Sequence, residues 1–125
     1  MKIHDNGIIE TYIGDTILYP LYLNIGSEWH PERLKLADGD SITFDVFEAN
    51  KSVSVLSKTI SSDDAEHQLE DVTTEFGDIL IEFDTKETSI LHSGVYYYEV
   101  HGMVTIDKKR TYCVFIPRTK FIVRE

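Results

Sequence analysis

Five histidines and one cysteine carry the most versatile chemistry in this chain of 125 residues. No two histidines stand two or four residues apart, the spacing that puts two imidazoles on one face as metal ligands. His101 is expected on the outward face of a strand, as a surface histidine. Cys113 lies in the apolar run Tyr112–Ile116, where a small buried core residue is expected, and a lone cysteine excludes an intrachain disulfide. These residues predict no metal site, no cofactor and no catalytic role.

The 22 Asp and Glu residues are the other candidate catalytic groups. Many of them lie between Asp63 and Glu75, without the Asp-x-Asp-x-Asp-Gly loop of a calcium site, so a solvated acidic loop is expected there. The run Asp38-Gly39-Asp40 is typical of a tight turn. Counting does not exclude a glycosidase-like carboxylate pair, but such a pair needs a cleft that raises one pKa. Nucleophile-elbow, Walker and dinucleotide motifs are missing, so the chain is predicted not to be an enzyme.

Aromatic side chains are the remaining candidates, for binding rather than catalysis. Trp29 lies in the irregular segment Gly26–Pro31. It either packs as a lid over one end of the domain or stays exposed as an anchor for a partner or a sugar. Tyr97 is expected to point outward between two inward tyrosines, and Tyr22 and Phe47 would extend it into an aromatic outer face. These four residues are the predicted partner-binding candidates.

The formal net charge of −10 narrows the choice of partner. An acidic chain repels the phosphates of nucleic acids and anionic membrane surfaces, so neither is expected to bind. The compact basic group Lys108–Arg110 is expected as a solvated turn. The sequence shows no leader peptide and no run of about 18 apolar residues, so we expect a soluble protein made in a cytoplasm.

Alternation of apolar and polar residues predicts an all-β domain. About seven or eight short strands at about ten-residue spacing favour a sandwich or barrel that covers residues 1–125 as a single domain. Pro20 indicates an edge or a bulge, and a short helical turn is expected near residues 85–91, capped by Asp84. The strands are predicted at about Ile8–Ile13, Ile17–Ile25, Ser41–Glu48, Val53–Ile60, Asp78–Asp84, Val95–Ile106, Thr111–Ile116 and Thr119–Arg124.

The run Ser93–Val100 predicts a corner before a long strand. Gly94 can adopt the backbone angles that end the helical turn and begin the strand. Tyr96, near the start of the penultimate long strand, can reach back with its hydroxyl to a buried backbone group, as in the tyrosine corner of Greek-key sandwiches. Tyr98 stands where antibody domains have a cysteine, which excludes their inter-sheet disulfide. Gly94 and Tyr96 are therefore predicted to be structural residues.

Several segments in chain order share turn-and-strand signatures with one known family. They are Gly14-Asp-Thr16, Asp38-Gly-Asp40 with the strand that follows it, Ile79–Asp84, Leu91–Glu99 and Lys120–Glu125. On these segments the chain resembles small immunoglobulin-like virion proteins of tailed bacteriophages, in particular the N-terminal domain of phage baseplate upper proteins. The resemblance covers about Gly14 to Glu125 and implies an immunoglobulin-like antiparallel β-sandwich.

The resemblance also implies a function. It indicates a non-enzymatic structural protein of the tail or baseplate, made in the bacterial host cytoplasm and carried in the virion. Such a protein acts as an assembly or adaptor module among other virion proteins, as a homo-oligomer or within a larger assembly. The family's C-terminal stem to a receptor-binding protein is not expected, because the sequence ends at Glu125. Alternatives are capsid decoration or fibre attachment, and, from another class, a carbohydrate-binding or cell-surface adhesion module that uses Trp29 and outward tyrosines.

Overall fold

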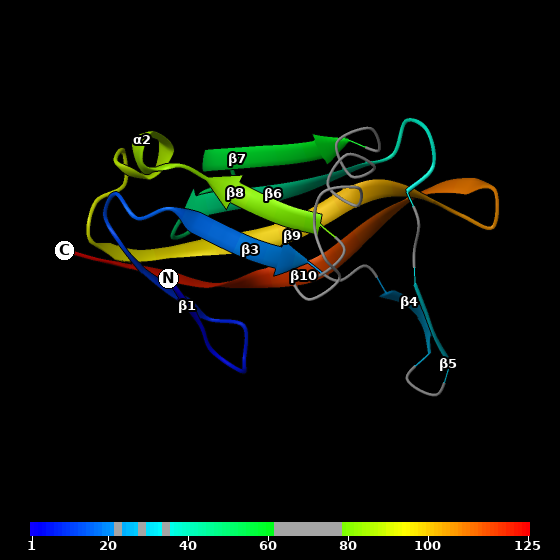
Figure 1. Ribbon diagram of the computed structural model, residues 1–125, viewed down its shortest axis with the longest axis horizontal. Helices are drawn as coiled ribbons and strands as arrows, with labels where there is room; N and C mark the ends of the chain where they lie inside the picture. Colours follow the sequence, from blue (N-terminus) through cyan, green and yellow to red (C-terminus); the bar gives the residue numbers. More distant parts are fainter. Residues whose placement is uncertain (22–23, 28–29, 34–35, 62–78) are drawn as a thin grey trace.

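The computed structural model describes residues 1–21, 24–27, 30–33, 36–61 and 79–125. These residues form mostly β-strands, with one short helix (Figure 1). No helix among them is long and apolar enough to cross a bilayer. The elements in chain order are β1 (Lys2–Ile3), β2 (Ile9–Tyr12), β3 (Ile17–Leu21), β4 (Asn24–Ser27), β5 (His30–Arg33), β6 (Ser41–Glu48), β7 (Ser54–Ser61), β8 (Ile79–Phe83), α2 (Thr85–Thr88), β9 (Gly94–Ile106) and β10 (Lys109–Arg124).

Six of the strands form one mixed sheet in the order β1-β2-β10-β9-β6-β7. The pairs β3–β8 and β4–β5 form two smaller sheets. The ladders are antiparallel except for β2 and β10, where Ile9–Tyr12 runs parallel to Phe121–Arg124. The expected all-β fold is therefore confirmed, but a purely antiparallel arrangement is wrong. A parallel pair needs a long crossover, and here most of the chain lies between the two strands.

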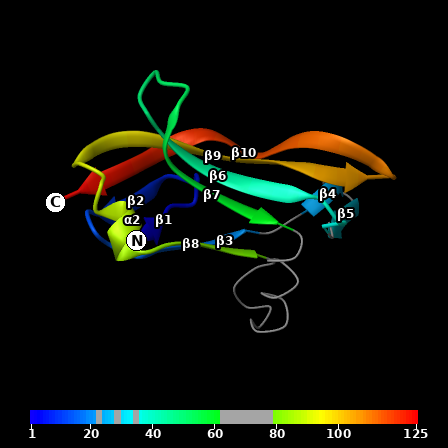
Figure 2. The ribbon, with the colours of Figure 1, turned by 90° about the horizontal axis from the view of Figure 1, so that it is seen from above.

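The core lies between the β3–β8 pair and the six-stranded sheet, which form two layers in Figure 2. Phe44 of β6 stands at its centre. Its ring stacks on Tyr98 of β9 with the ring centroids 5.1 Å apart and meets Phe83 of β8 edge-on at 5.5 Å. Tyr19 of β3 lies 5.4 Å from the Phe44 ring. Because burial of one large apolar side chain stabilises a fold by about 1.5–3 kcal/mol, this aromatic cluster is a main force that holds the two layers together.

Most strands follow the predicted alternation. In β6 the side chains of Ile42, Phe44 and Val46 are fully buried, and the even positions of β9 from Tyr96 to Val104 also face the core. Three predictions about strand boundaries are wrong. The strand expected at Ile17–Ile25 is divided, because β3 ends at Leu21 and pairs with β8, whereas β4 pairs with β5. Pro117 does not end a strand, because β10 continues past it through two register shifts between Val114 and Thr119. The stretch expected to be irregular contains the β4–β5 hairpin.

Bulges and turns explain how β9 and β10 run as one long hairpin. A bulge lets a strand absorb a proline that has no N–H to donate. At the hairpin tip, Asp107 and Lys108 have positive φ angles of 51° and 67°, as a two-residue type I′ turn requires. Of the basic group Lys108–Arg110, only Lys108 lies in the exposed turn, whereas Lys109 and Arg110 begin β10, so the expected turn is confirmed only in part.

Helix α2 begins with the predicted cap at Asp84. The Asp84 carboxylate accepts a hydrogen bond from the Glu87 N–H at 2.8 Å, and the Glu87 carboxylate accepts one from the Asp84 N–H at 3.2 Å. This reciprocal capping box satisfies two donors at the helix start. Gly94, which follows the helical turn, has a φ of 147°, an angle that a residue with a Cβ rarely adopts.

A buried carboxylate joins the turn before β6 to the end of β9. Asp40 is only 1% exposed. Its Oδ2 accepts hydrogen bonds from the N–H groups of Ala37 and Thr105, both at 2.9 Å, and its Oδ1 accepts one from the Thr105 hydroxyl at 2.9 Å. Burial alone would raise the pKa of Asp40, but these hydrogen bonds outweigh it and hold the pKa below its ordinary value.

Candidate interaction surface

The outer face of the six-stranded sheet is the side turned away from β3 and β8 (Figure 2). Even positions of β9 face the core, so its odd positions point outward. The register sets Tyr97 of β9 between Phe47 of β6 and Lys120 of β10, and sets His101 of β9 beside Val114 of β10. We call the outward side chains of β6, β9 and β10 the outer face.

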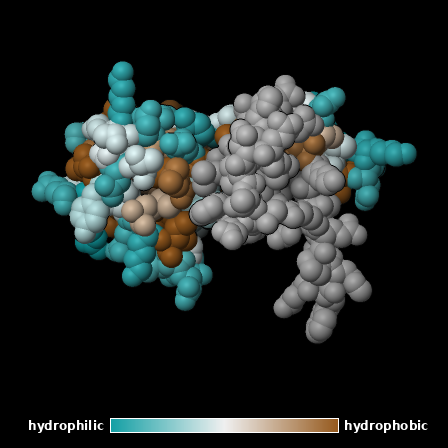
Figure 3. Space-filling model, in the orientation of Figure 1, coloured by the Kyte–Doolittle hydropathy of each residue, from teal (hydrophilic) through white to brown (hydrophobic). Residues whose placement is uncertain are grey.

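The most exposed apolar side chains of the outer face lie on the β9–β10 hairpin. Tyr112 and Val114 are exposed by 58% and 51%, and Met103, the cross-strand partner of Tyr112, by 38%. Beyond them the hairpin tip is hydrophilic in Figure 3 and carries exposed Lys108. Single exposed apolar residues are ordinary, but neighbours grouped on a rigid strand pair are typical of contact surfaces.

Positive charge is concentrated on β10. Residues 108–124, which are Lys108 of the turn and the whole of β10, contain six of the twelve Lys and Arg residues and no Asp or Glu. The rest of the chain holds the other six Lys and Arg residues and all 22 carboxylates. Lys109, Arg110, Arg118 and Lys120 are all exposed. The strand is therefore a basic and partly apolar surface on a strongly acidic protein, and such a surface favours contact with acidic groups.

His101 forms the central polar contact of the outer face. Its Nε2 lies 2.8 Å from Oδ2 of Asp45 on β6 and 3.9 Å from Oε1 of Glu99. Its ring centre is 5.8 Å from that of Tyr112 on β10. The predicted surface histidine is thus a half-buried link across three strands. In the described part of the chain no three His, Cys, Asp or Glu side chains come together as a metal site.

Two of the predicted partner-binding aromatics lie on the outer face. Tyr97 points outward and is half-buried, so its partner-binding role stays a prediction. The expectation that Phe47 adds exposed aromatic surface is wrong, because Phe47 is only 5% exposed. The guanidinium of Arg118 lies 4.2 Å above its ring and donates a hydrogen bond to the Lys51 carbonyl at 3.0 Å. This cation–π contact covers the ring and leaves a charged group at the surface.

The other two predicted aromatics, Trp29 and Tyr22, lie outside the described residues, as does the acidic stretch Asp63–Glu75. The alternative that Trp29 and outward tyrosines bind a glycan stays a prediction. Cys113 faces the core and is partly buried rather than fully buried.

The corner residues make structural contacts. The Tyr96 hydroxyl accepts a hydrogen bond from the His92 N–H at 3.1 Å, which is the reach back to the backbone that a tyrosine corner requires. The Tyr98 hydroxyl donates to the Gly7 carbonyl in the β1–β2 loop. Burial raises the pKa of Tyr98, so this hydroxyl stays protonated as a donor. Both tyrosines are buried and anchor loops to the sheet.

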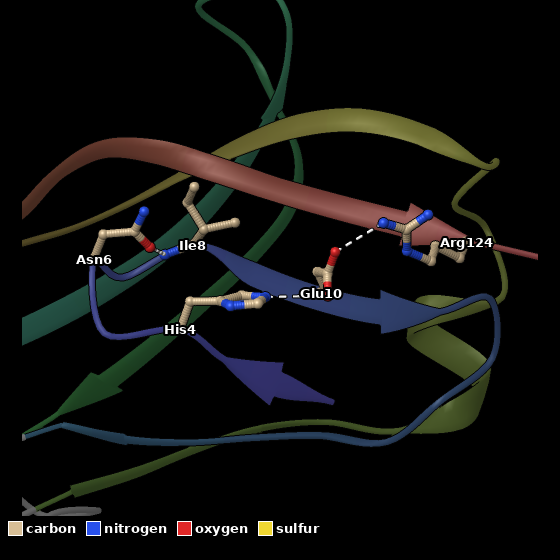
Figure 4. Close-up of polar contacts among 5 residues, drawn as sticks. All are labelled: His4, Asn6, Ile8, Glu10 and Arg124. Atoms are coloured by element: carbon tan, nitrogen blue, oxygen red, sulfur yellow. Dashed lines mark hydrogen bonds and ion pairs between the residues drawn. The ribbon is translucent and has the colours of Figure 1, made fainter.

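A second polar cluster joins β2 and the loop before it to the last strand, β10 (Figure 4). Glu10 of β2 accepts from Arg124 of β10 at 2.8 Å and lies 3.1 Å from Nε2 of His4. Asn6 shapes the preceding turn, because its side-chain oxygen accepts from the Ile8 N–H at 3.2 Å. The hydrogen bonds from Arg124 and His4 lower the pKa of Glu10. Both carboxylate oxygens are engaged, which suits a structural link rather than proton transfer.

A pocket of about 250 Å³ adjoins this cluster. Small-molecule sites usually have volumes of about 300–1,000 Å³ with convergent polar groups. The main charged groups of this pocket, Glu10 and Arg124, are already paired with each other. Of its other charged side chains, Lys2 has no ion pair in the described part of the chain, but one exposed lysine does not provide the convergent polar groups that fix a ligand. The pocket is lined by Met1, Lys2, Glu10, Thr11, Tyr12 and Arg124.

The basic character of β10 could have been predicted from the sequence, which was interpreted only as a basic turn at Lys108–Arg110. No carboxylate occurs between Lys108 and Arg124, in a chain where acids greatly outnumber bases. The contacts of His101 with Asp45 and of Glu10 with Arg124 had no such signal. Alternation shows which face a residue takes but not which strands become neighbours.

Comparison with known proteins places the chain in no family. No family model matches it, and neither a curated protein nor a solved structure does. The outer face is therefore interpreted from its own geometry and charge.

Proposed function

We propose that the chain is a non-enzymatic structural protein of a bacteriophage virion, a tail or baseplate component that acts as an assembly or adaptor module. The resemblance of its turn-and-strand segments to small immunoglobulin-like virion proteins motivates this function. An immunoglobulin-like arrangement of the strands is part of the proposal, and the corner contact between Tyr96 and His92 supports it. In this proposal the protein is made in the host cytoplasm and works in the particle.

The observation that carries the proposal is the grouped exposure of Tyr112, Val114 and Met103 on the outer face. The cores of protein interfaces are enriched in Tyr and Met and depleted of charge, and they have polar rims. Here the apolar group is followed toward the hairpin tip by Arg110 on β10, and on its other side lies His101, which contacts Asp45 and Glu99. The strands that carry it are held by long ladders, so little order is lost on binding.

The test measures incorporation into particles. Particles of a tailed phage that encodes this chain are purified, heads are separated from tails, and each fraction is analysed by quantitative mass spectrometry. The proposal expects the chain in the tail fraction at fixed stoichiometry. Its presence with heads would instead support capsid decoration. Its absence from both fractions would refute a virion role.

A matched pair of variants tests the outer face. Val114→Glu places a charge in the apolar group, whereas Val53→Glu places the same charge on a valine that is 78% exposed before β7. Disruption of an interface residue costs about tenfold or more in affinity. We therefore expect Val114→Glu to lower incorporation about tenfold and Val53→Glu to leave it unchanged, with both variants folded by circular dichroism. Equal effects of the two variants would count against this face.

A further inference from the structure

Among the described residues, one edge of β10 has no ladder partner over most of its length. β9 accompanies β10 from Lys109 to Val123, whereas β2 pairs with it at Phe121–Arg124. Within the described part of the chain, residues 109–120 therefore have a ladder partner on one side. Alternate residues of an antiparallel strand turn their N–H and C=O groups away from that partner. This half of β10 thus presents main-chain donors and acceptors that a further strand can bind.

The side chains along this edge suit an added strand. Tyr112 and Val114 are exposed, and aromatic and β-branched residues make favourable contacts across neighbouring strands. Pro117 has no N–H, and the register shifts begin after Val114. The regular part of the open edge therefore runs from Lys109 to about Phe115.

Charge selects the strand that can occupy the edge. A parallel, in-register second copy of β10 would set Lys109 and Arg110 beside their own copies, which is destabilising across a sheet, and an antiparallel copy over residues 109–115 would give these cations no acidic partner. Exposed lysines on edge strands are a known means of preventing such pairing. A segment with carboxylates would instead meet opposite charges, and no carboxylate of β10 itself opposes it.

From these observations we propose that Lys109–Phe115 is a docking edge for an extended acidic segment of a partner protein, which adds to the sheet as an antiparallel strand. Main-chain hydrogen bonds provide the affinity, while contacts with Tyr112 and the cations provide the selectivity. The inference rests on the proposed function, because it names the chemistry of the partner that an assembly module holds.

The test uses a labelled peptide, acetyl-Val-Thr-Val-Thr-Glu-Glu-amide, and the full chain. Antiparallel addition places its two glutamates beside Lys109 and Arg110. We expect saturable binding by fluorescence anisotropy that weakens in about 0.5 M salt. The same peptide with lysines in place of the glutamates should bind at least about tenfold more weakly. Hydrogen exchange read by mass spectrometry should slow at residues 109–115 when the acidic peptide binds.

Two charge reversals serve as a matched pair. Lys109→Glu lies at the edge and Lys86→Glu lies on α2, both are exposed, and both change the net charge equally. We expect about tenfold weaker peptide binding for Lys109→Glu and no change for Lys86→Glu. Equal effects of the two variants would show a long-range charge effect and overturn the proposal. Binding without slowed exchange at residues 109–115 would overturn it as well.

Two further outcomes would refute the docking edge without deciding the proposed function. If neither peptide binds, the cations serve only to prevent strand pairing. If light scattering shows a dimer whose residues 109–115 are already protected, a second copy occupies the edge. Either result is compatible with the chain in tail fractions. Conversely, peptide binding with no chain in purified particles would refute the virion role and leave the docking edge standing.

Discussion

Replacement of Asp40 removes the carboxylate that joins the turn before β6 to β9. In Asp40→Ala the N–H groups of Ala37 and Thr105 both lose their acceptor. A buried donor left without an acceptor costs about 1–3 kcal/mol, which applies to the N–H of partly buried Thr105, whereas water can reach the N–H of exposed Ala37 and the Thr105 hydroxyl can rotate toward another acceptor. We therefore expect the free energy of unfolding to fall by about 2 kcal/mol, and the midpoint of thermal unfolding to fall by about 7 °C.

Urea unfolding followed by circular dichroism measures the loss, with Asp38→Ala as the control. Asp38 lies in the same turn, two residues earlier, and is exposed, so its replacement should change stability by less than about 0.5 kcal/mol. Asp40→Asn should fall between the two, because the amide oxygen can still accept from both N–H groups while the charge is lost. Equal losses for Asp38→Ala and Asp40→Ala would refute the role assigned to the buried carboxylate.

The contribution of Asp40 to stability depends on pH. The pKa of Asp40 in the folded protein is below the ordinary aspartate value. Between these two pKa values the unfolded chain binds more protons than the folded protein, so stability rises with pH. The ionised carboxylate therefore stabilises the fold fully above about pH 4, the ordinary aspartate pKa. This contribution is lost as the pH falls through the folded pKa. The stability gap between wild type and Asp40→Asn should be constant near neutral pH and shrink in acid. A gap that stays constant through acid pH would contradict this.

Two further substitutions test close contacts in the sheet. A Cβ at Gly102 would overlap the Ser41 backbone oxygen, so Gly102→Ala should lower the free energy of unfolding by about 2 kcal/mol. A loss below about 0.5 kcal/mol in urea unfolding would show that β6 and β9 can separate freely. Tyr96→Phe removes the acceptor of the His92 N–H and should cost about 1 kcal/mol. The control is Tyr112→Phe, on a side chain that is 58% exposed, and it should leave the midpoint of thermal unfolding unchanged. If Tyr96→Phe is as stable as this control, the Tyr96 hydroxyl has no structural role in the corner.

Local patterns predicted what depends on one strand or turn at a time. Alternation gave the bounds of β6 and the buried side chains of Ile42, Phe44 and Val46, because a period of two commits one face to the core. The helix cap at Asp84 was also predictable, since its hydrogen bonds link residues three apart.

Contacts between segments that are distant in the chain could not be predicted from the sequence. The parallel pairing of β2 with β10 brings Glu10 to Arg124, and nothing in the sequence near either residue specifies the other. The burial of Phe47 arises from Arg118, whose position depends on the register shifts around Pro117. Register across a bulge is set by packing of the whole sheet rather than by local preference.

The distribution of charge along β10 indicates whether its open edge binds a partner strand or is only protected from pairing. At its C-terminal end, Arg124 is paired with Glu10 and the ladder with β2 is complete. In the described part of the chain Lys109 has no ion pair, and its half of the strand lacks a second ladder partner. Unneutralised charge and unpaired main chain therefore coincide at Lys109, whereas the Arg110 guanidinium lies close to Gly39 and to the Asp40 carboxylate. Protection against pairing would need only the cations, whereas the exposed Tyr112 beside them adds apolar surface that protection does not require. That combination favours a strand of opposite charge as the occupant of this edge.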